Sequence, residues 1–375
     1  MSSTSGETSG RAMRVVHLVP TMFGAERGIV GGAERYAFEL ARFMARRVST
    51  TLVSFGERDE QWDVDGLTVR VLGNTRYVRG QRSNPFSFAL PGALSGADVV
   101  HVHQQHIVAS SVTAVLARLR RQKVFVSDLG GGGWDVSGYV STDRWYHGHL
   151  HISEYSRQVF GHVSNPRAHV IYGGVDTDKF SPDASVPRTP TVLFVGRLLA
   201  HKGIDVLVDA IDEGLSLEVI GRPYDGDYLE LLQERAQGKN VTFRHDVSDP
   251  DLVAAYRQAA AIVLPSVYRD VYGHSMTVPE LLGQTLLEGM ACGTPAVCAD
   301  VASMPEVVTD GVTGFVVPPN DPIALRERLH TLVEDAELNV AMGSAARADV
   351  LERFTWPRVV DRCLDIYEQQ VRGRR

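Results

Sequence analysis

Two glutamates stand in the stretch PELLGQTLLEGMACGTP, at Glu280 and Glu288, with seven residues between them. Carboxylates accept hydrogen bonds, and the vicinal hydroxyls of a ribose or hexose ring are suitable donors to them. Gly283 lies between the two, and Gln284 and Thr285 occupy the expected start of a helix, where backbone N–H groups attract phosphate. Taken alone, the glutamates are better explained as a first-turn helix charge at Glu280 and a solvent-facing residue at Glu288.

A pair of cations follows another expected strand, in the stretch FVGRLLAHKGIDVLVDAI. The strand ends at Gly196, and Arg197 and Lys202 flank the turn into the next helix. Two positive charges and a helix N-terminus add in their attraction for a diphosphate. The alternative is that both are ordinary solvated side chains. Two cations at one strand-to-helix junction favour the ligand site.

Two glycine-rich stretches also follow expected strands. Gly31 and Gly32, in GIVGGAERYAFEL, open a helix and would let a phosphate or sugar approach backbone N–H groups. The pattern is not GxGxxG, so a dinucleotide site is weakly supported, and a turn that packs helix on sheet is the alternative. In VSDLGGGGWD, Asp128 precedes four glycines. We expect a close-contact loop there, or a flexible connector, with Asp128 as a polar group near a reacting sugar.

Three histidines lie in DVVHVHQQH, at positions 101, 103 and 106. His101 and His103 alternate on an expected strand and share one face, and His106 lies just past its end. No fourth ligand at a suitable spacing accompanies them. We therefore expect core or cleft-lining histidines and no metal site.

The elements that must position these residues form two series of short β-branched runs separated by helical patterns. Strands alternating with helices predict βαβ units and parallel sheets, whose ligands bind beyond the carboxyl ends of the strands. The segment KFSPDASVPRTP, rich in Pro, Ser and Asp, divides the two series and is expected to be a linker. The expected strands are RVVHLV, TTLVSF, DVVHVH, KVFVS and HVIY, then TVLFVG, LEVIG, NVTFR, AIVLP and PAVCAD.

Composition bounds the class of protein. A chain of 375 residues exceeds what one hydrophobic core usually supports, so two domains are expected. The net charge of −7, from 38 basic and 45 acidic residues, argues against nucleic-acid binding through bulk positive charge. No apolar run approaches the roughly 20 residues that span a bilayer. The polar start MSSTSGETSGRA lacks the apolar core of a secretory signal and is expected to be a disordered leader.

Three cysteines, Cys292, Cys298 and Cys363, follow no metal-ligand spacing and are expected to be buried thiols, which fits a reducing cytoplasm. The helices LARFMARR and LARLRRQK are basic on one side. Ordinary solvated faces explain them, and a peripheral contact with the inner face of the membrane or a lipid-linked acceptor is the alternative.

Taken together, these stretches resemble a known family. From about Arg14 to the final helix, the chain resembles retaining glycosyltransferases of the GT-B fold, specifically glycosyltransferase family four, through GGAERYAFELA, DVVHVH, ISEYSRQVF, VIYGGVDTDKF, VGRLLAHKGID, ELLGQTLLEGMACGTPAV and MPEVVTDGVTGFVVPP. The resemblance implies an α/β fold of two Rossmann-like domains facing across a cleft, with a C-terminal helix returning to the N-terminal domain. The expected parts are a leader at 1–12, an acceptor-side domain at 13–178, a linker at 179–190, a nucleotide-sugar domain at 191–355 and the returning helix at 356–375.

The resemblance also implies roles for matching residues. Glu288 would hold the ribose hydroxyls of the donor nucleotide, and Glu280 would contact the donor sugar. Arg197 and Lys202 match the pair that grips the donor diphosphate. The expected catalytic set is Glu280, Arg197, Lys202 and Asp128, and the expected donor-binding set is Gly31, Gly32, Gly196, Arg197, Lys202, Glu280, Leu282, Gly283, Gln284, Thr285 and Glu288.

Two features depart from the family pattern. Members commonly carry His where the glycine loop begins, whereas this chain has Asp128, which could still orient the donor sugar or an acceptor hydroxyl. The chain also has an insertion at 267–279, before Glu280, which is expected either to shape donor or acceptor choice or to be a surface loop without a role.

The function implied is a retaining, metal-independent transfer of a sugar from a nucleotide diphosphate sugar to a hydroxyl acceptor on a glycan, a lipid-linked molecule or a small molecule. No cofactor or metal is expected, since no DxD-like acidic pair stands at a strand end. The alternatives are a nucleotide-sugar-binding protein without transferase activity, an epimerase or phosphorylase of the same fold, and a nicotinamide oxidoreductase. A cytoplasmic protein is expected; the nucleobase, sugar, acceptor, linkage and oligomeric state are left open.

Overall fold

The computed structural model describes residues 12–20 and 31–372, so the expected leader lies almost wholly outside the described residues. Within them the chain forms two compact units. Unit 1 comprises the chain up to His151, Asn165–His169 and the chain from Val360, and unit 2 comprises Ile152–Ser164 and Val170–Val359. The expected linker, 179–190, contains no helix or strand and belongs to unit 2.

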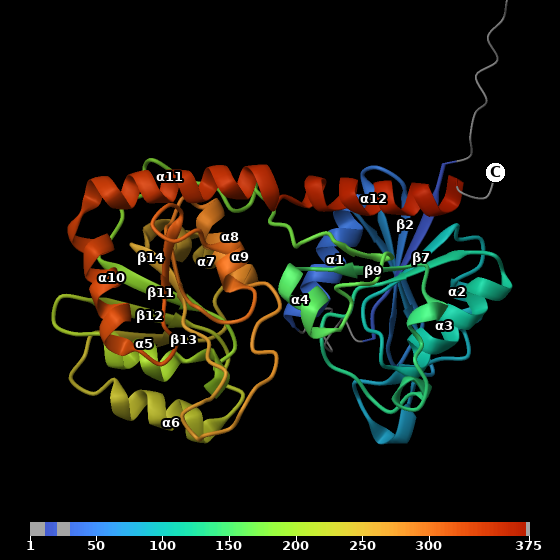
Figure 1. Cartoon of the computed structure of the whole chain (residues 1–375), viewed down its shortest axis with the longest axis horizontal. Helices are drawn as coiled ribbons and strands as arrows, with labels where there is room; N and C mark the ends of the chain where they lie inside the picture. The colour runs from blue at the N-terminus through green and yellow to red at the C-terminus, as the bar shows by residue number, and fades with distance from the viewer. Residues whose placement is uncertain (1–11, 21–30, 373–375) are drawn as a thin grey trace, which may run out of the picture. The chain divides into compact units, whose positions relative to one another are not determined.

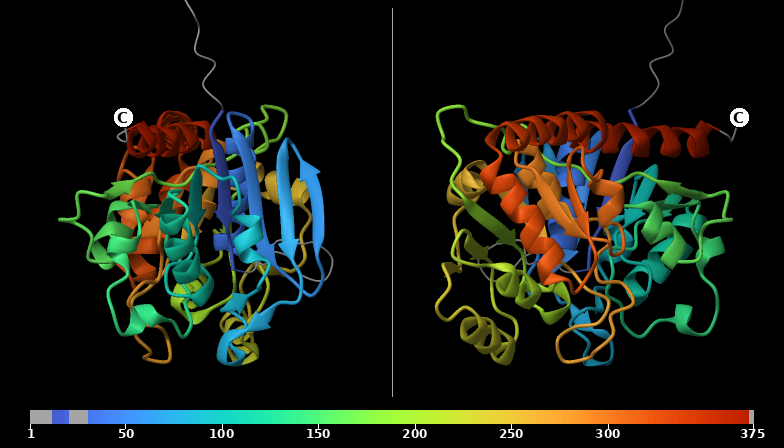
Figure 2. Two further views of the ribbon diagram at one scale, coloured as in Figure 1. Left: turned by 90° about the vertical axis from the view of Figure 1, so that its right-hand side faces the viewer. Right: turned by 60° about the vertical axis from the view of Figure 1, so that its left-hand side comes forward.

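Unit 1 is built on an eight-stranded sheet with the strand order β10-β9-β8-β7-β1-β2-β4-β3. The central pairs are parallel, and β3 runs antiparallel to β4. Figure 2 shows the twist of these strands. The strands are β1 (Arg14–Leu18), β2 (Ser49–Phe55), β3 (Glu60–Val64), β4 (Leu67–Leu72), β7 (Val99–Val102), β8 (Lys123–Val126), β9 (Gly148–His151) and β10 (Ala168–Val170), with a separate hairpin of β5 (Arg76–Tyr77) and β6 (Pro85–Phe86).

Helices cover this sheet because their apolar residues recur at helical spacing. In α1, Ala37, Leu40, Ala41 and Met44 are all fully buried. Helix α12 begins in unit 2 and joins unit 1 from Val360, so the expected returning helix is confirmed (Figure 1). The helices are α1 (Gly32–Ala45), α2 (Leu90–Ala93), α3 (Val108–Leu119) and α12 (Trp356–Arg372), with short 3₁₀ turns η1 (Val78–Gly80), η2 (Val136–Gly138) and η3 (Asp143–Trp145).

Unit 2 is built on a wholly parallel six-stranded sheet in the order β13-β12-β11-β14-β15-β16. The two strands AIVL and AVCA are buried at every position, as expected for a parallel sheet covered on both faces. The strands are β11 (Thr191–Val195), β12 (Ser216–Ile220), β13 (Val241–Arg244), β14 (Ala261–Leu264), β15 (Ala296–Ala299) and β16 (Gly314–Val317).

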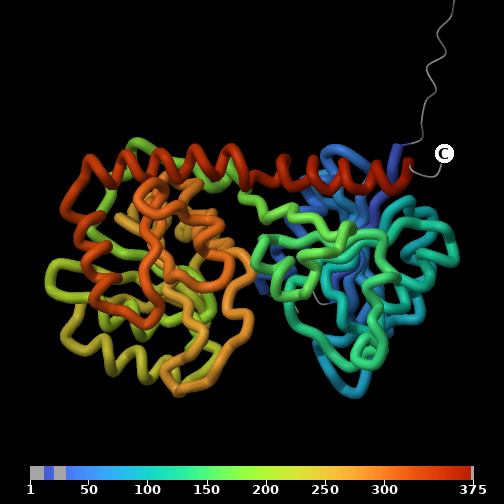
Figure 3. Tube along the Cα trace, in the orientation of Figure 1, coloured from blue at the N-terminus to red at the C-terminus, as the bar shows by residue number. Residues whose placement is uncertain are grey.

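Several helices of unit 2 begin at side-chain caps, whereas α5, α8 and α9 have none. The side chains of Asp225, Ser248, Asp321 and Asp335 accept hydrogen bonds from the first-turn N–H groups of α6, α7, α10 and α11. Helices α10 and α11 follow the last strand of unit 2 and are drawn in orange-red to red in Figure 3. The helices are α4 (Glu154–Val159), α5 (Ile204–Ala210), α6 (Gly226–Arg235), α7 (Asp249–Gln258), α8 (Gln284–Ala291), α9 (Met304–Val307), α10 (Pro322–Glu334) and α11 (Ala336–Arg353), with the 3₁₀ turn η4 (Ala200–Lys202).

The strand order fixes where each sheet can hold a ligand. Chain order reverses direction at the β1–β7 pair in unit 1 and at the β11–β14 pair in unit 2. Loops leaving adjacent strands at such a point run in opposite directions and leave a crevice at the carboxyl ends. The expected α/β fold with two parallel sheets is confirmed. Ligands would lie beside the residues that follow β1, β7, β11 and β14.

Candidate functional site

In unit 2, the turn after β11 packs on the chain that leaves β14. The backbone N–H of Val267 donates to the carbonyl of His201 at 2.9 Å. Gly203 lies at the same contact with φ +66°, and a Cβ there would come 2.1 Å from the carbonyl oxygen of Pro265. Only glycine fits this position, so the contact holds η4 against the loop that carries the first glutamate.

This contact brings Lys202 and Glu280 together, although they are 78 residues apart. The ammonium of Lys202 forms an ion pair with Oε1 of Glu280, and the hydroxyl of Ser266 lies 3.4 Å from the same oxygen. The two charged side chains are only 13% and 12% exposed. Such an ion pair is costly to desolvate, so its position at the carboxyl ends of β11 and β14 indicates a site that receives a charged or polar ligand.

Two further side chains accompany the pair. Arg197 is exposed, with its guanidinium carbon 5.6 Å from the ring centroid of Tyr224. His201 is half-buried, and burial, reinforced by the charge of Lys202, lowers its pKa to about 4. The imidazole is therefore neutral at neutral pH, and the positive charge of this loop comes from Arg197 and Lys202. Strand β11 ends at Val195, one residue earlier than expected, and Gly196 follows it directly.

The opening of α8 places four predicted residues in one turn. Gly283 is the N-cap with φ +84°, a left-handed conformation that favours glycine, and the buried Leu282 anchors the loop before it. The side-chain amide of Gln284 donates to the carbonyl of Gly174 at 2.7 Å. Thr285 is half-buried in the first turn. Gln284 therefore helps to fix the start of the helix, where the N–H of Leu286 donates to the carbonyl of Gly283 at 3.0 Å.

Glu288 lies further along α8 and is only 5% exposed. The hydroxyl of Tyr256, a fully buried residue of α7, donates to its Oε2 at 2.7 Å. The interpretation of Glu288 as a solvent-facing residue is therefore wrong. A carboxylate buried in this way needs hydrogen-bond donors, and it stands one helix turn beyond Gln284 on the same helix.

The remaining predicted residues belong to unit 1. Gly31 is the extended N-cap of α1, and a Cβ there would lie 2.6 Å from Oε2 of Glu34. Gly32 is exposed and has open space where a Cβ would stand. The glycines therefore begin α1 as expected, and the residues that precede them, 21–30, lie outside the described part of the chain.

Asp128 lies two residues after the end of β8 and is almost fully buried, and its Oδ1 accepts from the N–H of Gly130 at 3.1 Å. The next three glycines, Gly130, Gly131 and Gly132, all have positive φ, which explains the run of this residue type. The Nε2 of His106 lies 3.7 Å from Oδ2 of Asp128. The loop is thus folded back on the end of β7, and the expectation of a close-contact loop fits better than that of a flexible connector.

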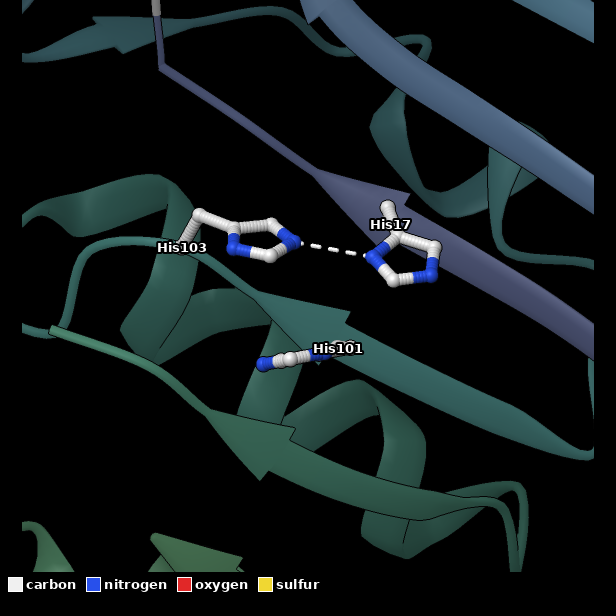
Figure 4. A group of neighbouring side chains, drawn as sticks. All are labelled: His17, His101 and His103. Carbon is white, nitrogen blue, oxygen red and sulfur yellow. Dashed lines mark hydrogen bonds between the residues drawn. The ribbon is translucent and has the colours of Figure 1, made fainter. Parts of the chain in front are cut away.

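His101 and His103 are buried core histidines, as expected, and His17 of β1 joins them (Figure 4). Nδ1 of His17 lies 2.8 Å from Nε2 of His103. The two nitrogens of His101 contact the hydroxyls of Ser127 at 2.9 Å and of Tyr367 at 2.7 Å. Ligand nitrogens of the three rings lie within 4.8 Å of one another, a spacing that a metal ion could also use. The hydrogen-bond distances account for the arrangement without one.

His106 differs from these three, because its side chain is 47% exposed. Its Nδ1 lies 3.0 Å from the hydroxyl of Ser137.

The three cysteines are all buried, as expected, and burial raises the pKa of the Cys292 and Cys363 thiols to about 12. These thiols are therefore neutral and unreactive at neutral pH.

The insertion at 267–279 is an ordered hairpin. Arg269 and Ser275 pair as an antiparallel bridge, and the Asp270 carboxylate accepts from the N–H groups of Tyr272 and His274 at 3.0 and 2.9 Å. The ring of Tyr272 packs edge-on against Tyr228 of α6. The hydroxyl of Tyr155 of α4 donates to the carbonyl of Thr277 at 3.0 Å. These contacts hold the insertion against α4 and α6 of unit 2, immediately before Glu280.

Three residues of the unit 2 site escape the sequence analysis. Ser266 sits in the pair PS directly after β14, and His201 precedes Lys202 in AHKG, so position beside a predicted residue was the signal for both. Tyr256 lies in DLVAAYRQAA as one more apolar residue of an amphipathic helix. Its contact with Glu288 gives no local sequence signal.

Two protein families match this chain. The family described as "Glycosyl transferases group 1" matches residues 176–349, and "Glycosyltransferase Family 4" matches residues 30–179. A GDP-mannose-dependent alpha-(1-6)-phosphatidylinositol monomannoside mannosyltransferase of Mycolicibacterium smegmatis is 32% identical over 227 residues. That match covers 55% of this chain and 58% of the relative, so the chain spans less than two thirds of that relative's length.

A second relative and a solved structure extend the coverage. The alpha-maltose-1-phosphate synthase of Mycolicibacterium smegmatis is 31% identical over 274 residues, which are 64% of this chain and 68% of the relative. The crystal structure of Anabaena Alr3699/HepE in complex with UDP and glucose is similar with a TM-score of 0.73 and 19% identity, over 95% of this chain and 100% of the other. By these matches the chain belongs to glycosyltransferase family 4.

Proposed function

We propose that this protein transfers a sugar from a nucleotide diphosphate sugar to a hydroxyl acceptor, with retention at the anomeric carbon and without a metal ion. The observation that carries the proposal is the desolvated pair of Lys202 and Glu280 where the order of the unit 2 strands reverses, directly before the helix that buries Glu288. Lys202 of η4 suits a diphosphate, and the carboxylates of Glu280 and Glu288 suit the hydroxyls of a sugar and of a ribose.

The diphosphate end of the donor would lie against Lys202 and Arg197. When the bond from the anomeric carbon to the phosphate oxygen breaks, negative charge grows on the phosphate. Preorganised cations and the N–H groups that begin α8 stabilise this charge more than they stabilise the bound donor, which is the usual source of rate enhancement. Lys202 already has a fixed position because Glu280 holds it.

The sugar and nucleotide ends would be held by the two glutamates. Glu280 would accept from hydroxyls of the donor sugar while it holds Lys202, and Glu288 would accept from the ribose hydroxyls. Family resemblance supplies the proton's route. The acceptor hydroxyl attacks from the face that the phosphate leaves, its oxygen bonds to the anomeric carbon, and its proton passes to the departing phosphate oxygen. No separate general base is then required.

Unit 1 would contribute the acceptor side. Asp128 lies just after β8 with a carboxylate that accepts from the N–H of Gly130, and Gly31 and Gly32 begin α1. The relatives' names mention a phosphatidylinositol mannoside and maltose 1-phosphate, so a sugar or inositol hydroxyl on a phosphorylated molecule is the acceptor class to try first. Among the described residues, no helix has the length and apolar character that a membrane crossing needs. A lipid-linked acceptor would then be met at the bilayer surface.

The test starts from donor binding. The full chain is heated with GDP-, UDP-, ADP- and dTDP-sugars, and the correct donor raises the unfolding temperature because it binds only the folded state. The stabilising donor is then incubated with phosphatidylinositol, inositol phosphate and glucose 1-phosphate, and the anomeric configuration of the product is read by proton NMR. We expect an axial donor linkage to give an axial product.

Three outcomes would refute the proposal. Inversion of the anomeric centre would rule out retention. Binding of a donor with no transfer to any acceptor class, and no slow donor hydrolysis, would favour the binding protein without activity. An altered nucleotide sugar, or release of a sugar phosphate, would favour the epimerase or phosphorylase.

A further inference from the structure

The carboxylate of Glu288 is positioned by a residue of a different helix. Tyr256 of α7 donates its hydroxyl to Oε2 of Glu288 at 2.7 Å, and both residues are buried. Helices α7 and α8 are neighbours in unit 2 (Figure 1). A glutamate has three side-chain torsions and would lose much of its freedom on binding a ligand. The phenol removes part of that freedom before any ligand arrives.

Tyr256 is itself held from three sides. The hydroxyl of Thr294 donates to its backbone carbonyl at 2.6 Å, and the guanidinium of Arg188 donates to that hydroxyl at 2.9 Å. The same guanidinium donates to the carbonyl of Ala259, one residue beyond the end of α7, at 2.6 Å. The ring of Phe180 packs edge-on with a centroid distance of 5.8 Å. These contacts restrict the position of the phenol and hold the C-terminal end of α7 in place.

We propose that Tyr256 is the positioning residue that orients Glu288 for the ribose hydroxyls of the donor. The inference rests on the proposed function, because it assumes that Glu288 binds the nucleotide. An ionised carboxylate offers about four lone-pair sites, so it can accept the Tyr256 phenol at Oε2, which helps to fix its plane, together with other donors such as sugar hydroxyls. Tyr256 acts on the donor only through Glu288. Its contribution is preorganisation, which improves affinity by reducing the ordering cost of binding.

Unit 2 contains a matched pair that serves as a control. Tyr228 of α6 donates its hydroxyl to Oδ1 of Asp205 at 2.8 Å, and both residues are buried. Tyr228→Phe and Tyr256→Phe thus remove the same atom from the same kind of contact, each with a buried carboxylate as acceptor. Only Tyr256 touches a residue of the proposed donor site. A purely structural role would give the two variants the same effects.

The experiment measures dissociation constants for GDP and 2′,3′-dideoxy-GDP by calorimetry, with the UDP and ADP pairs run in the same way. The wild-type protein should prefer the ribonucleotide by on the order of 10²-fold, as expected when a buried polar group loses its partners in the dideoxy form. Tyr256→Phe should reduce this preference about tenfold and weaken GDP binding, with the dideoxy affinity unchanged. Tyr228→Phe should keep the wild-type preference.

A double substitution separates action through Glu288 from a general effect. Glu288→Ala should abolish the ribose preference, and adding Tyr256→Phe should weaken nucleotide binding no further. Additive losses would overturn the inference, because they would mean that the phenol acts independently. If Tyr256→Phe does not fold, Thr294→Val, which removes the hydroxyl that joins Arg188 to the Tyr256 carbonyl, should show a smaller loss of preference in the same direction.

The failures are distinguishable. A wild-type protein that binds none of the nucleotides refutes the proposed function. A wild-type protein that binds both forms equally refutes the ribose role of Glu288. A wild-type protein that prefers the ribonucleotide, with Tyr256→Phe within twofold of that preference, overturns the positioning role alone.

Discussion

Each unit gathers buried polar side chains at its central parallel strands, but the two groups differ in charge. In unit 1, His17, His101 and His103 contact one another and the hydroxyls of Ser127 and Tyr367. Burial lowers the pKa of all three histidines, so the group is neutral at pH 7. In unit 2 the corresponding group is an ion pair beside a buried carboxylate.

We propose that this difference separates a structural group in unit 1 from a functional group in unit 2. A neutral imidazole can be buried at modest cost when its nitrogens are hydrogen-bonded, and the histidines meet that condition except at Nδ1 of His103, which has no hydrogen-bond partner among the described residues. A desolvated ion pair contributes little to stability, and two packed apolar residues would often replace it without loss. Retention of charge at Lys202 and Glu280 is therefore best explained by what the charges bind.

The largest expected effect removes the charge of unit 2. Arg197→Ala with Lys202→Met should lower turnover about 10³-fold or more, because the growing charge on the leaving phosphate loses both cations. The circular dichroism spectrum should be retained, and steady-state donor kinetics supply the measurement. Turnover within tenfold of the wild type would remove the distinction drawn between the two groups.

The second effect is a loss of stability of unit 1 in acid. His17 has a pKa of about 3 in the folded protein against 6.5 when unfolded, so the unfolded state binds more protons as the pH falls below 6.5. Stability is therefore complete above pH 6.5 and falls towards pH 3, by about 2 kcal/mol at pH 5 from this residue alone. Guanidinium unfolding at pH 7 and pH 5 measures it. His17→Gln should show the smaller drop, and an equal drop would mean that His17 does not titrate on unfolding.

A third effect concerns the helix that joins unit 1. Tyr367→Phe leaves Nδ1 of the buried His101 without its partner, which should cost about 1–3 kcal/mol. The thermal midpoint should fall by several degrees while the donor Michaelis constant stays within twofold of the wild type. A raised donor Michaelis constant in a folded variant would show that the histidine group serves the donor site as well.

The smallest effect is expected at Ser266. Its hydroxyl lies 3.4 Å from Oε1 of Glu280, which is a long hydrogen bond beside a much stronger ion pair. Ser266→Ala should change turnover by no more than about fivefold. A loss comparable to that of the cation variant would mean that the hydroxyl, and not the ammonium, sets the position of Glu280.

The sequence predicts most strands of the two sheets, because apolar β-branched runs such as TVLFV and AIVL are typical of strands between helical patterns, but it does not predict β3, β4, β9 and β16. It also predicts the junctions that matter, since ligands of parallel sheets lie at their carboxyl ends. The sequence does not predict contacts between residues that are far apart in the chain. His17 joins His101 and His103 only through the pairing of β1 with β7, and Tyr256 reaches Glu288 only because α7 and α8 pack together.

The same limit applies to the insertion at 267–279. Its composition does not decide between a surface loop without a role and a segment that shapes the site. That depends on contacts between residues far apart in the chain, those of Tyr272 with Tyr228 and of Tyr155 with Thr277. Strand β4 (LTVRVL) is another case. It is not among the expected strands, and its place between β2 and β3 follows only from the sheet order.

The central claim is that the charged residues of unit 2, and not the histidines of unit 1, hold the nucleotide. Calorimetric titration with the nucleoside diphosphate that binds best tests it most directly, in the wild type, Glu288→Ala and Tyr367→Phe. We expect Glu288→Ala to lose at least about 30-fold in affinity, or 2 kcal/mol, and Tyr367→Phe to bind as the wild type does. Unchanged affinity in Glu288→Ala, or a comparable loss in folded Tyr367→Phe, would contradict the claim.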